Sequence, residues 1–177
     1  RALAGRLGRD GVALRESGQV PLLGSKATHA AVAAQPPGTV DIADMSDNPG
    51  GGAASDSTFL LRAMLERGMR DAAVGLLWDP QAVRIAFKAG EGATIPMRIG
   101  GKLGPMSGAP LDVMATVRCL RTDAAQPHIA DGGAAALGRT AVIETQDIEI
   151  VMNEIRQQPF HPEAFTNSGV DPWSRRV

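Results

Sequence analysis

Cysteine and aromatic residues are scarce in this chain of 177 residues, and tyrosine is absent. The one cysteine, Cys119, excludes an intrachain disulfide and any zinc site built from several cysteines. Aromatic residues make up 3% of the sequence, so few rings are available for stacking on bases or sugars. No apolar run approaches the ~18 residues that span a bilayer, and the first residues lack a signal-peptide pattern. We therefore expect a cytoplasmic protein with no membrane partner.

An excess of positive charge is also lacking, because 18 Lys and Arg stand against 19 Asp and Glu. Binding to a phosphate backbone usually requires a basic surface, so nucleic acid is not an expected partner. Hydrophobic residues account for 44% and charged residues for 21% of the chain, which is typical of a soluble globular domain.

Glycine and proline cluster in a few short stretches that divide the chain. Residues 1–38 contain helix formers and predict a helical lead-in, which Pro36, Pro37 and Gly38 end. Residues 39–177 then predict an α/β domain. Because residue 1 is Arg and residues 174–177 resemble the start of a strand, we expect a fragment truncated at both ends.

The first half of the α/β domain predicts strand, loop, helix and strand in succession. Residues 39–43 alternate like a short strand, and a glycine-rich loop follows at 44–54. The run TFLLRAMLERG at 58–68 has the apolar spacing of a buried helix, which Ser55, Asp56 or Ser57 could cap. The apolar run 72–78 predicts a strand covered on both faces in a parallel sheet. A second helix is expected between Asp79 and Gly90.

The second half predicts antiparallel strands with short turns, over residues 94–99, 111–120, 140–144 and 148–155. A short helix is expected from Pro162 to Gly169. Strict alternation places Cys119 on the same core-facing side as Val113, Ala115 and Val117, which predicts an inert thiol. The expected fold class is therefore α/β with a mixed sheet.

The most unusual motif is DNPGGG at residues 47–52. Three consecutive glycines are entropically costly unless positive φ angles or a close approach to the backbone require them. A loop between a strand and a helix can offer free N–H groups to a carboxylate, phosphate or oxyanion. The motif matches neither of the common nucleotide-binding glycine motifs, and a tight turn without a ligand explains it equally well.

Polar residues around both glycine-rich stretches are candidates for a site. Asp44, Asp47 and Asp56 either make turns and helix caps, or Asp47 and Asn48 point toward a ligand at the strand ends. The second stretch, GGKLGPMSGAP, carries Lys102, which either belongs to a plain connecting loop or balances the charge of a bound anion.

The three histidines, His29, His128 and His161, are far apart in the sequence. None has a second histidine at the spacing of a zinc motif, so no metal ligand is expected in this chain. A GxSxG nucleophile motif is also missing from the sequence.

Three stretches in one order carry a resemblance to a known family: ADMSDNPGGGAASDSTFLLRAMLERG, then GLLWDPQAVRIAFKAGEGATIPMRIGGKLGPMSGAP, then PEAFTNSGVDP. Over about residues 5–177 the chain resembles the C-terminal domain of the MlrC, or microcystinase C-like, metallopeptidases. The resemblance implies part of a metal-dependent hydrolase whose zinc is bound by acidic residues and histidines of a larger N-terminal domain. The isolated chain is then expected to be inactive.

The family motifs also imply candidate site residues. The candidates are Asp47 and Asn48 as catalytic residues, and Gly50, Gly51, Gly52, Asp56 and Lys102 as substrate-binding residues. The resulting hypothesis is a domain that lines the cleft of a zinc-dependent peptidase or amidohydrolase and positions a small peptide or amide for metal-assisted hydrolysis. Its main partner would be the N-terminal metal-binding domain of the same polypeptide, with homo-oligomerisation left open. The alternative is a non-catalytic anion-binding, structural or dimerisation module.

Overall fold

The computed structural model describes residues 2–15, 17, 22–130 and 132–177. Packing separates the chain into two compact units, residues 1–33 and 34–177, which are described each by itself. The first unit holds α1 (Ala2–Ala13) and most of α2 (Ser25–Ala34). A domain boundary after Gly38 stays a prediction. No helix in the described ranges is long and apolar enough to cross a membrane.

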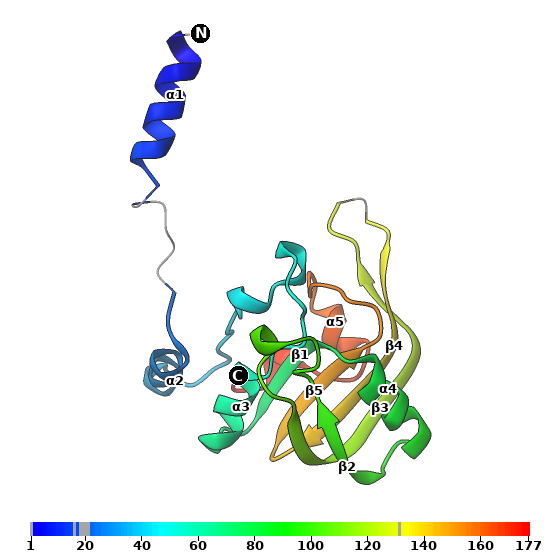
Figure 1. Cartoon of the computed structure of the whole chain (residues 1–177). Coiled ribbons are helices and arrows are strands. Elements are labelled where there is room, and N and C mark those ends of the chain that lie inside the picture. The colour runs from blue at the N-terminus through cyan, green and yellow to red at the C-terminus, as the bar shows by residue number, and fades with distance from the viewer. Residues whose placement is uncertain (1, 16, 18–21, 131) are drawn as a thin grey trace. The chain divides into compact units, whose positions relative to one another are not determined.

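The second unit is built on a five-stranded sheet with the order β1-β5-β4-β3-β2 (Figure 1). Its strands are β1 (Ala72–Trp78), β2 (Thr94–Ile99), β3 (Leu111–Pro127), β4 (Ala134–Thr145) and β5 (Ile148–Asn153). β1 runs parallel to β5, and the other neighbouring pairs are antiparallel. The predicted α/β class with a mixed sheet is confirmed, and β3 and β4 extend further than predicted, into a long hairpin.

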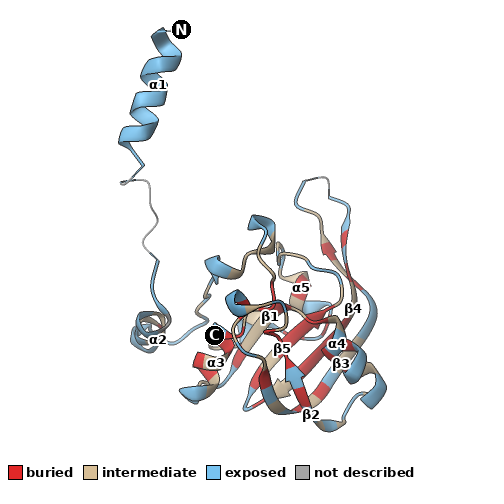
Figure 2. Ribbon diagram, in the orientation of Figure 1, coloured by how far each residue is buried: buried red, intermediate tan, exposed pale blue. Residues whose placement is uncertain are grey.

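Helices cover both faces of this sheet. They are α3 (Phe59–Glu66), α4 (Pro80–Ala89) and α5 (Glu163–Thr166), with 3₁₀ turns η1 (Met45–Asp47), η2 (Pro49–Gly51), η3 (Pro105–Ser107) and η4 (Pro172–Ser174). The larger core cluster packs α3 and α4 against Ile143 and Ile150, and a smaller one packs α5 against Val142 and Val151. Successive strand residues point to opposite faces, so the two clusters lie on opposite sides of the sheet. Figure 2 shows the buried residues concentrated along the strands.

Both predicted helices of the first half are confirmed, with one difference in capping. α3 follows Thr58, which makes no side-chain capping bond, and Gly68 ends it with a φ of 64°. α4 has the predicted start, because the Asp79 carboxylate accepts a hydrogen bond from the Ala82 N–H at 3.0 Å. Proline in the first turn supports this start by fixing φ.

The strand predicted at residues 39–43 is wrong, since this segment joins no sheet. Its Val40 N–H donates to the Arg176 carbonyl at 3.0 Å. Residues 176 and 177 lie beside the start of β1 instead. The Ala73 N–H donates to the Val177 carbonyl, and the Arg176 N–H donates to the Asp71 carbonyl, both at 2.7 Å. Alternation alone cannot make a strand when another segment occupies the sheet edge.

The predicted position of Cys119 is also wrong. Val117 pairs with Ile143 and Cys119 with Val142, so the register shifts by one residue between them. Such a bulge reverses the face to which the following side chains point. Cys119 therefore packs in the smaller cluster, while Val117 lies in the larger one.

Candidate functional site

The DNPGGG loop folds into the two turns η1 and η2, which its own polar groups hold together. The Asn48 side-chain oxygen accepts the Gly50 N–H at 2.8 Å. The Asn48 main-chain carbonyl accepts the Gly51 N–H at 3.0 Å, and the Pro49 carbonyl accepts the Gly52 N–H at 3.1 Å. All three glycine N–H groups are thus used within the loop, contrary to the expectation that they are free for an anion.

The three glycines satisfy different requirements. A Cβ on Gly50 would clash with the amide oxygen of Gln158. Gly52 has a φ of 92°, which disfavours other residues. A Cβ on Gly51 would meet nothing within 4 Å. The fold therefore requires glycine at position 52, tolerates a side chain at position 50 only if the end of Gln158 moves, and gives no reason for glycine at position 51.

Asp47 connects this loop to the segment before α3. One carboxylate oxygen accepts the Ser55 N–H at 2.8 Å, and the other accepts the Ser57 N–H at 2.7 Å. Burial is the largest influence on this carboxyl and raises the pKa of Asp47, although the two N–H groups act in the opposite direction. The side chain fixes the shape of the loop through both oxygens.

Asp56 and Lys102 lie in a buried polar network that joins the two glycine-rich stretches. Asp56, with an exposed fraction of 1%, accepts the N–H groups of Lys102 at 2.7 Å and Leu103 at 3.1 Å. The Lys102 ammonium lies 2.7 and 2.6 Å from the two carboxylate oxygens of Asp79. The charge that Lys102 balances in this structure is therefore that of Asp79.

Sequence reasoning assigned Asp79 a capping role only. Its side chain is 1% exposed and also accepts the Gly100 N–H at 2.9 Å. This one carboxylate therefore connects the end of β1, the first turn of α4 and the GGK segment. The Asp-Pro signal at residues 79 and 80 predicts the cap. Nothing in the sequence indicates the ion pair with Lys102.

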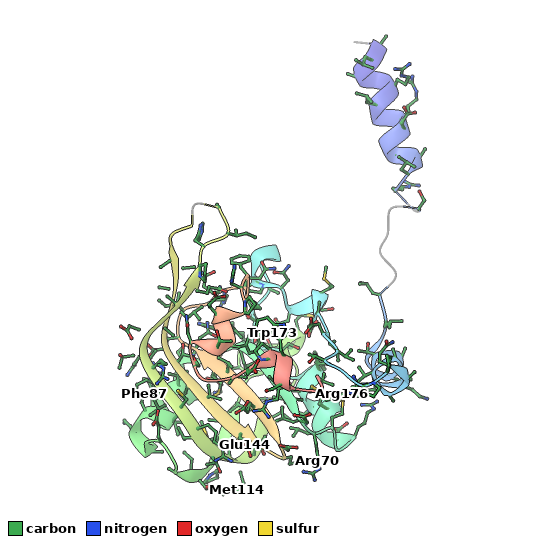
Figure 3. All side chains as sticks on the ribbon, turned by 180° about the vertical axis from the view of Figure 1, so that it is seen from behind. Arg70, Phe87, Met114, Glu144, Trp173 and Arg176 are labelled. Carbon is green, nitrogen blue, oxygen red and sulfur yellow. The ribbon has the colours of Figure 1, made fainter. Side chains whose placement is uncertain are left out.

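A groove of about 770 Å³ lies next to the DNPGGG loop and is lined by residues of β1. Asp47 and Asn48 line it, whereas Asp56, Lys102 and the three glycines do not. The segment 158–161 also lines the groove. The buried Gln126 fixes this segment by accepting the Phe160 N–H at 2.9 Å and donating to the Gln158 carbonyl at 2.7 Å. Trp173, labelled in Figure 3, also lines the groove and is 64% exposed.

His161 is a groove residue that sequence reasoning placed only at a helix start. Its Nδ1 contacts the carboxylate of Glu163, and this hydrogen bond lowers the pKa of Glu163. In the described part of the chain, no three His, Cys, Asp or Glu side chains are placed to bind a metal ion together. The described residues therefore offer no ligand set for a resident metal.

These features define a mixed α/β domain with a groove at one sheet edge, bordered by a glycine-rich loop. Residues 42–177 match the family described as MlrC C-terminus, so the chain belongs to that family.

Two known proteins are similar to the chain. It is 42% identical to microcystinase C of Sphingomonas sp. over 137 residues, which cover 77% of this chain and 27% of the relative. The fold is similar to the crystal structure of a protein from Mesorhizobium sp. BNC1 assigned as a metallopeptidase, with a TM-score of 0.81 and 28% identity. That match covers 93% of this chain and 33% of the solved chain. The chain thus spans about a quarter of the curated relative and a third of the solved structure.

Proposed function

We propose that this domain forms one wall of the active-site cleft of a zinc-dependent peptidase or amidohydrolase. The observation that carries the proposal is the groove beside the DNPGGG loop, in a domain similar to part of microcystinase C. The metal would be bound by a part of the enzyme outside this chain, in accord with the lack of a ligand group among the described residues. A cytoplasmic location stays a prediction.

Within the cleft, the candidate residues divide into two roles. Asn48 lines the groove and would contact the substrate, and Asp47 would position the loop through its bonds to Ser55 and Ser57. Asp56 and Lys102 would support the cleft from the buried network, and direct substrate binding by them stays a prediction.

The alternative of an anion-binding module has less support. The glycine N–H groups donate within the loop, and the described residues that line the groove include aspartates but no Lys or Arg. An anion would therefore meet repulsion without compensating donors from the loop.

The substitution Gly51→Val in the full-length enzyme tests whether the loop faces the cleft. A Cβ at position 51 would meet no atom within 4 Å, so folding should be retained. If the loop contacts substrate or the metal-bearing domain, turnover should decrease about tenfold or more at unchanged zinc content.

The matched control is Gly24→Val, which also has open space and lies outside the loop. It should leave turnover unchanged. A folded, zinc-loaded Gly51→Val enzyme with unaltered kinetics would reduce the loop to a structural turn and contradict the proposed cleft.

A further inference from the structure

His161 differs in chemistry from the other titratable side chains that line the groove. Among the described lining residues, it is the one titratable group that is not a carboxyl group. Its side chain is 49% exposed, so a molecule in the groove can reach it. Histidine commonly gains and loses a proton near neutral pH, and it is the most frequent general acid or base in enzymes. In a hydrolase cleft, His161 is therefore a candidate for proton transfer.

The segment that carries His161 is held in place by a buried amide. Gln126 of β3 is 2% exposed, and its Oε1 accepts the N–H groups of Phe160 at 2.9 Å and His161 at 3.3 Å. A Cβ on Gly50 would clash with Gln158, so the segment also touches the DNPGGG loop. A fixed backbone limits the positions that the imidazole can take, which proton transfer at a defined atom requires.

Glu163 orients the imidazole of His161. Its carboxylate contacts Nδ1 of the ring, and this hydrogen bond lowers the pKa of Glu163. An ionised carboxylate can only accept a hydrogen bond, so Nδ1 carries the hydrogen. Glu163 does not line the groove, which leaves Nε2 as the ring nitrogen for a molecule bound there. A carboxylate at Nδ1 holds the ring and stabilises the imidazolium in the Ser-His-Asp hydrolases as well.

Two of the aspartates that line the groove are less suited to transfer a proton. The Asp47 carboxylate accepts the N–H groups of Ser55 and Ser57 with its two oxygens. The Asp44 carboxylate accepts the Ser46 N–H at 3.0 Å. These carboxylates stabilise the loop conformation, and a proton on either of them would compete with a backbone N–H for the same oxygen.

We propose that His161 is the general acid of the hydrolytic reaction, which protonates the leaving nitrogen of the substrate from Nε2, and that Glu163 is its positioning residue. Water adds its oxygen to the carbonyl carbon, the C–N bond breaks, and the nitrogen takes the proton from Nε2. The proton that the water gives up restores the imidazolium, so His161 is regenerated. The inference rests on the proposed function and adds these two residues to it.

The variant His161→Asn in the full-length enzyme tests this role. The asparagine amide can donate to Glu163 in place of Nδ1, but it carries no group that replaces Nε2 as an acid. One probe is acetyl-Ala-Leu-Ala-amide, whose amine leaves with a proton. The other is the p-nitrophenyl ester of acetyl-Ala-Leu, whose nitrophenolate leaves without one. The kcat/KM for the peptide should decrease about 100-fold or more, whereas that for the ester should change less than about threefold.

Two further variants separate catalysis from structure. The matched control His128→Asn changes a half-buried histidine that does not line the groove, and it should leave both rates unchanged. Glu163→Gln keeps an acceptor but removes the charge, so peptide hydrolysis should decrease about tenfold or more. Added to His161→Asn, it should cause no further loss, because Glu163 acts through His161.

Circular dichroism and zinc content, measured for each variant, complete the test. Unchanged peptide hydrolysis in His161→Asn, or an equal loss for peptide and ester, would overturn the inference while the proposed function stands. Loss of zinc from His161→Asn would also overturn it, because His161 would then be a metal ligand. If the wild-type enzyme hydrolyses no peptide or amide, the proposed function fails and this inference fails with it.

Discussion

Replacement of Lys102 by methionine tests whether this residue stabilises the domain from within. Asp79 is 1% exposed, and the ammonium of Lys102 lies 2.6 Å from one of its oxygens. Lys102→Met keeps the apolar stem but leaves the buried carboxylate with only the N–H donors of Gly100 and Ala82. Removing one partner of a buried ion pair costs about 3–5 kcal/mol. Lys102 itself is 25% exposed, so we expect the lower end, about 3 kcal/mol.

The free energy of unfolding can be measured by urea titration followed by circular dichroism, with the m-value as a check on two-state behaviour. The matched control is Lys88→Met, at an exposed position in the last turn of α4, where only a helix-dipole contribution below about 1 kcal/mol is lost. If both variants lost the same small amount, the Asp79–Lys102 pair would contribute no more than a surface charge. A Lys102→Met enzyme of unchanged stability but a raised KM would instead favour substrate binding by Lys102.

Three further predictions concern the loop, the thiol and the metal. The variant Asp47→Asn keeps one oxygen as an acceptor but turns an amide donor toward one of the N–H groups of Ser55 and Ser57. The free energy of unfolding, measured by urea titration, should therefore decrease by about 1–3 kcal/mol. An unchanged value would mean that these two hydrogen bonds contribute nothing to stability. Burial raises the pKa of the Cys119 thiol above the usual 9.0. Its labelling by a thiol reagent at pH 8 should therefore be slower in the folded chain than in the urea-unfolded chain, and the rate in the folded chain should still increase as the pH passes 9.0. Equal rates in the two states at pH 8 would refute this prediction. The isolated chain should retain no stoichiometric zinc after dialysis against a weak chelator and should hydrolyse no peptide; bound zinc measured by atomic absorption would contradict this.

Local signals in the sequence were sufficient for most elements of the α/β unit. The apolar run of β1, the alternation in β2 and the Asp-Pro start of α4 each depend on residues close together in the chain. The order of the DNPGGG and GGK motifs also carried the family resemblance, which the match over residues 42–177 confirms. Turn chemistry likewise indicated the side-chain turn of Asp44, whose carboxylate accepts the Ser46 N–H at 3.0 Å.

Contacts between distant residues decided the rest. β1 takes β5 as its parallel partner, and the end of the chain occupies the place where a strand at residues 39–43 was expected. A one-residue bulge moved Cys119 to the other face, and the pairing of Lys102 with Asp79 depends on the contact between the segments that follow β1 and β2. Sequence fixes propensity and pattern locally, but register, edge occupancy and ion pairing depend on which segments fold against each other. For that reason the groove along β1 could be found only in the tertiary structure.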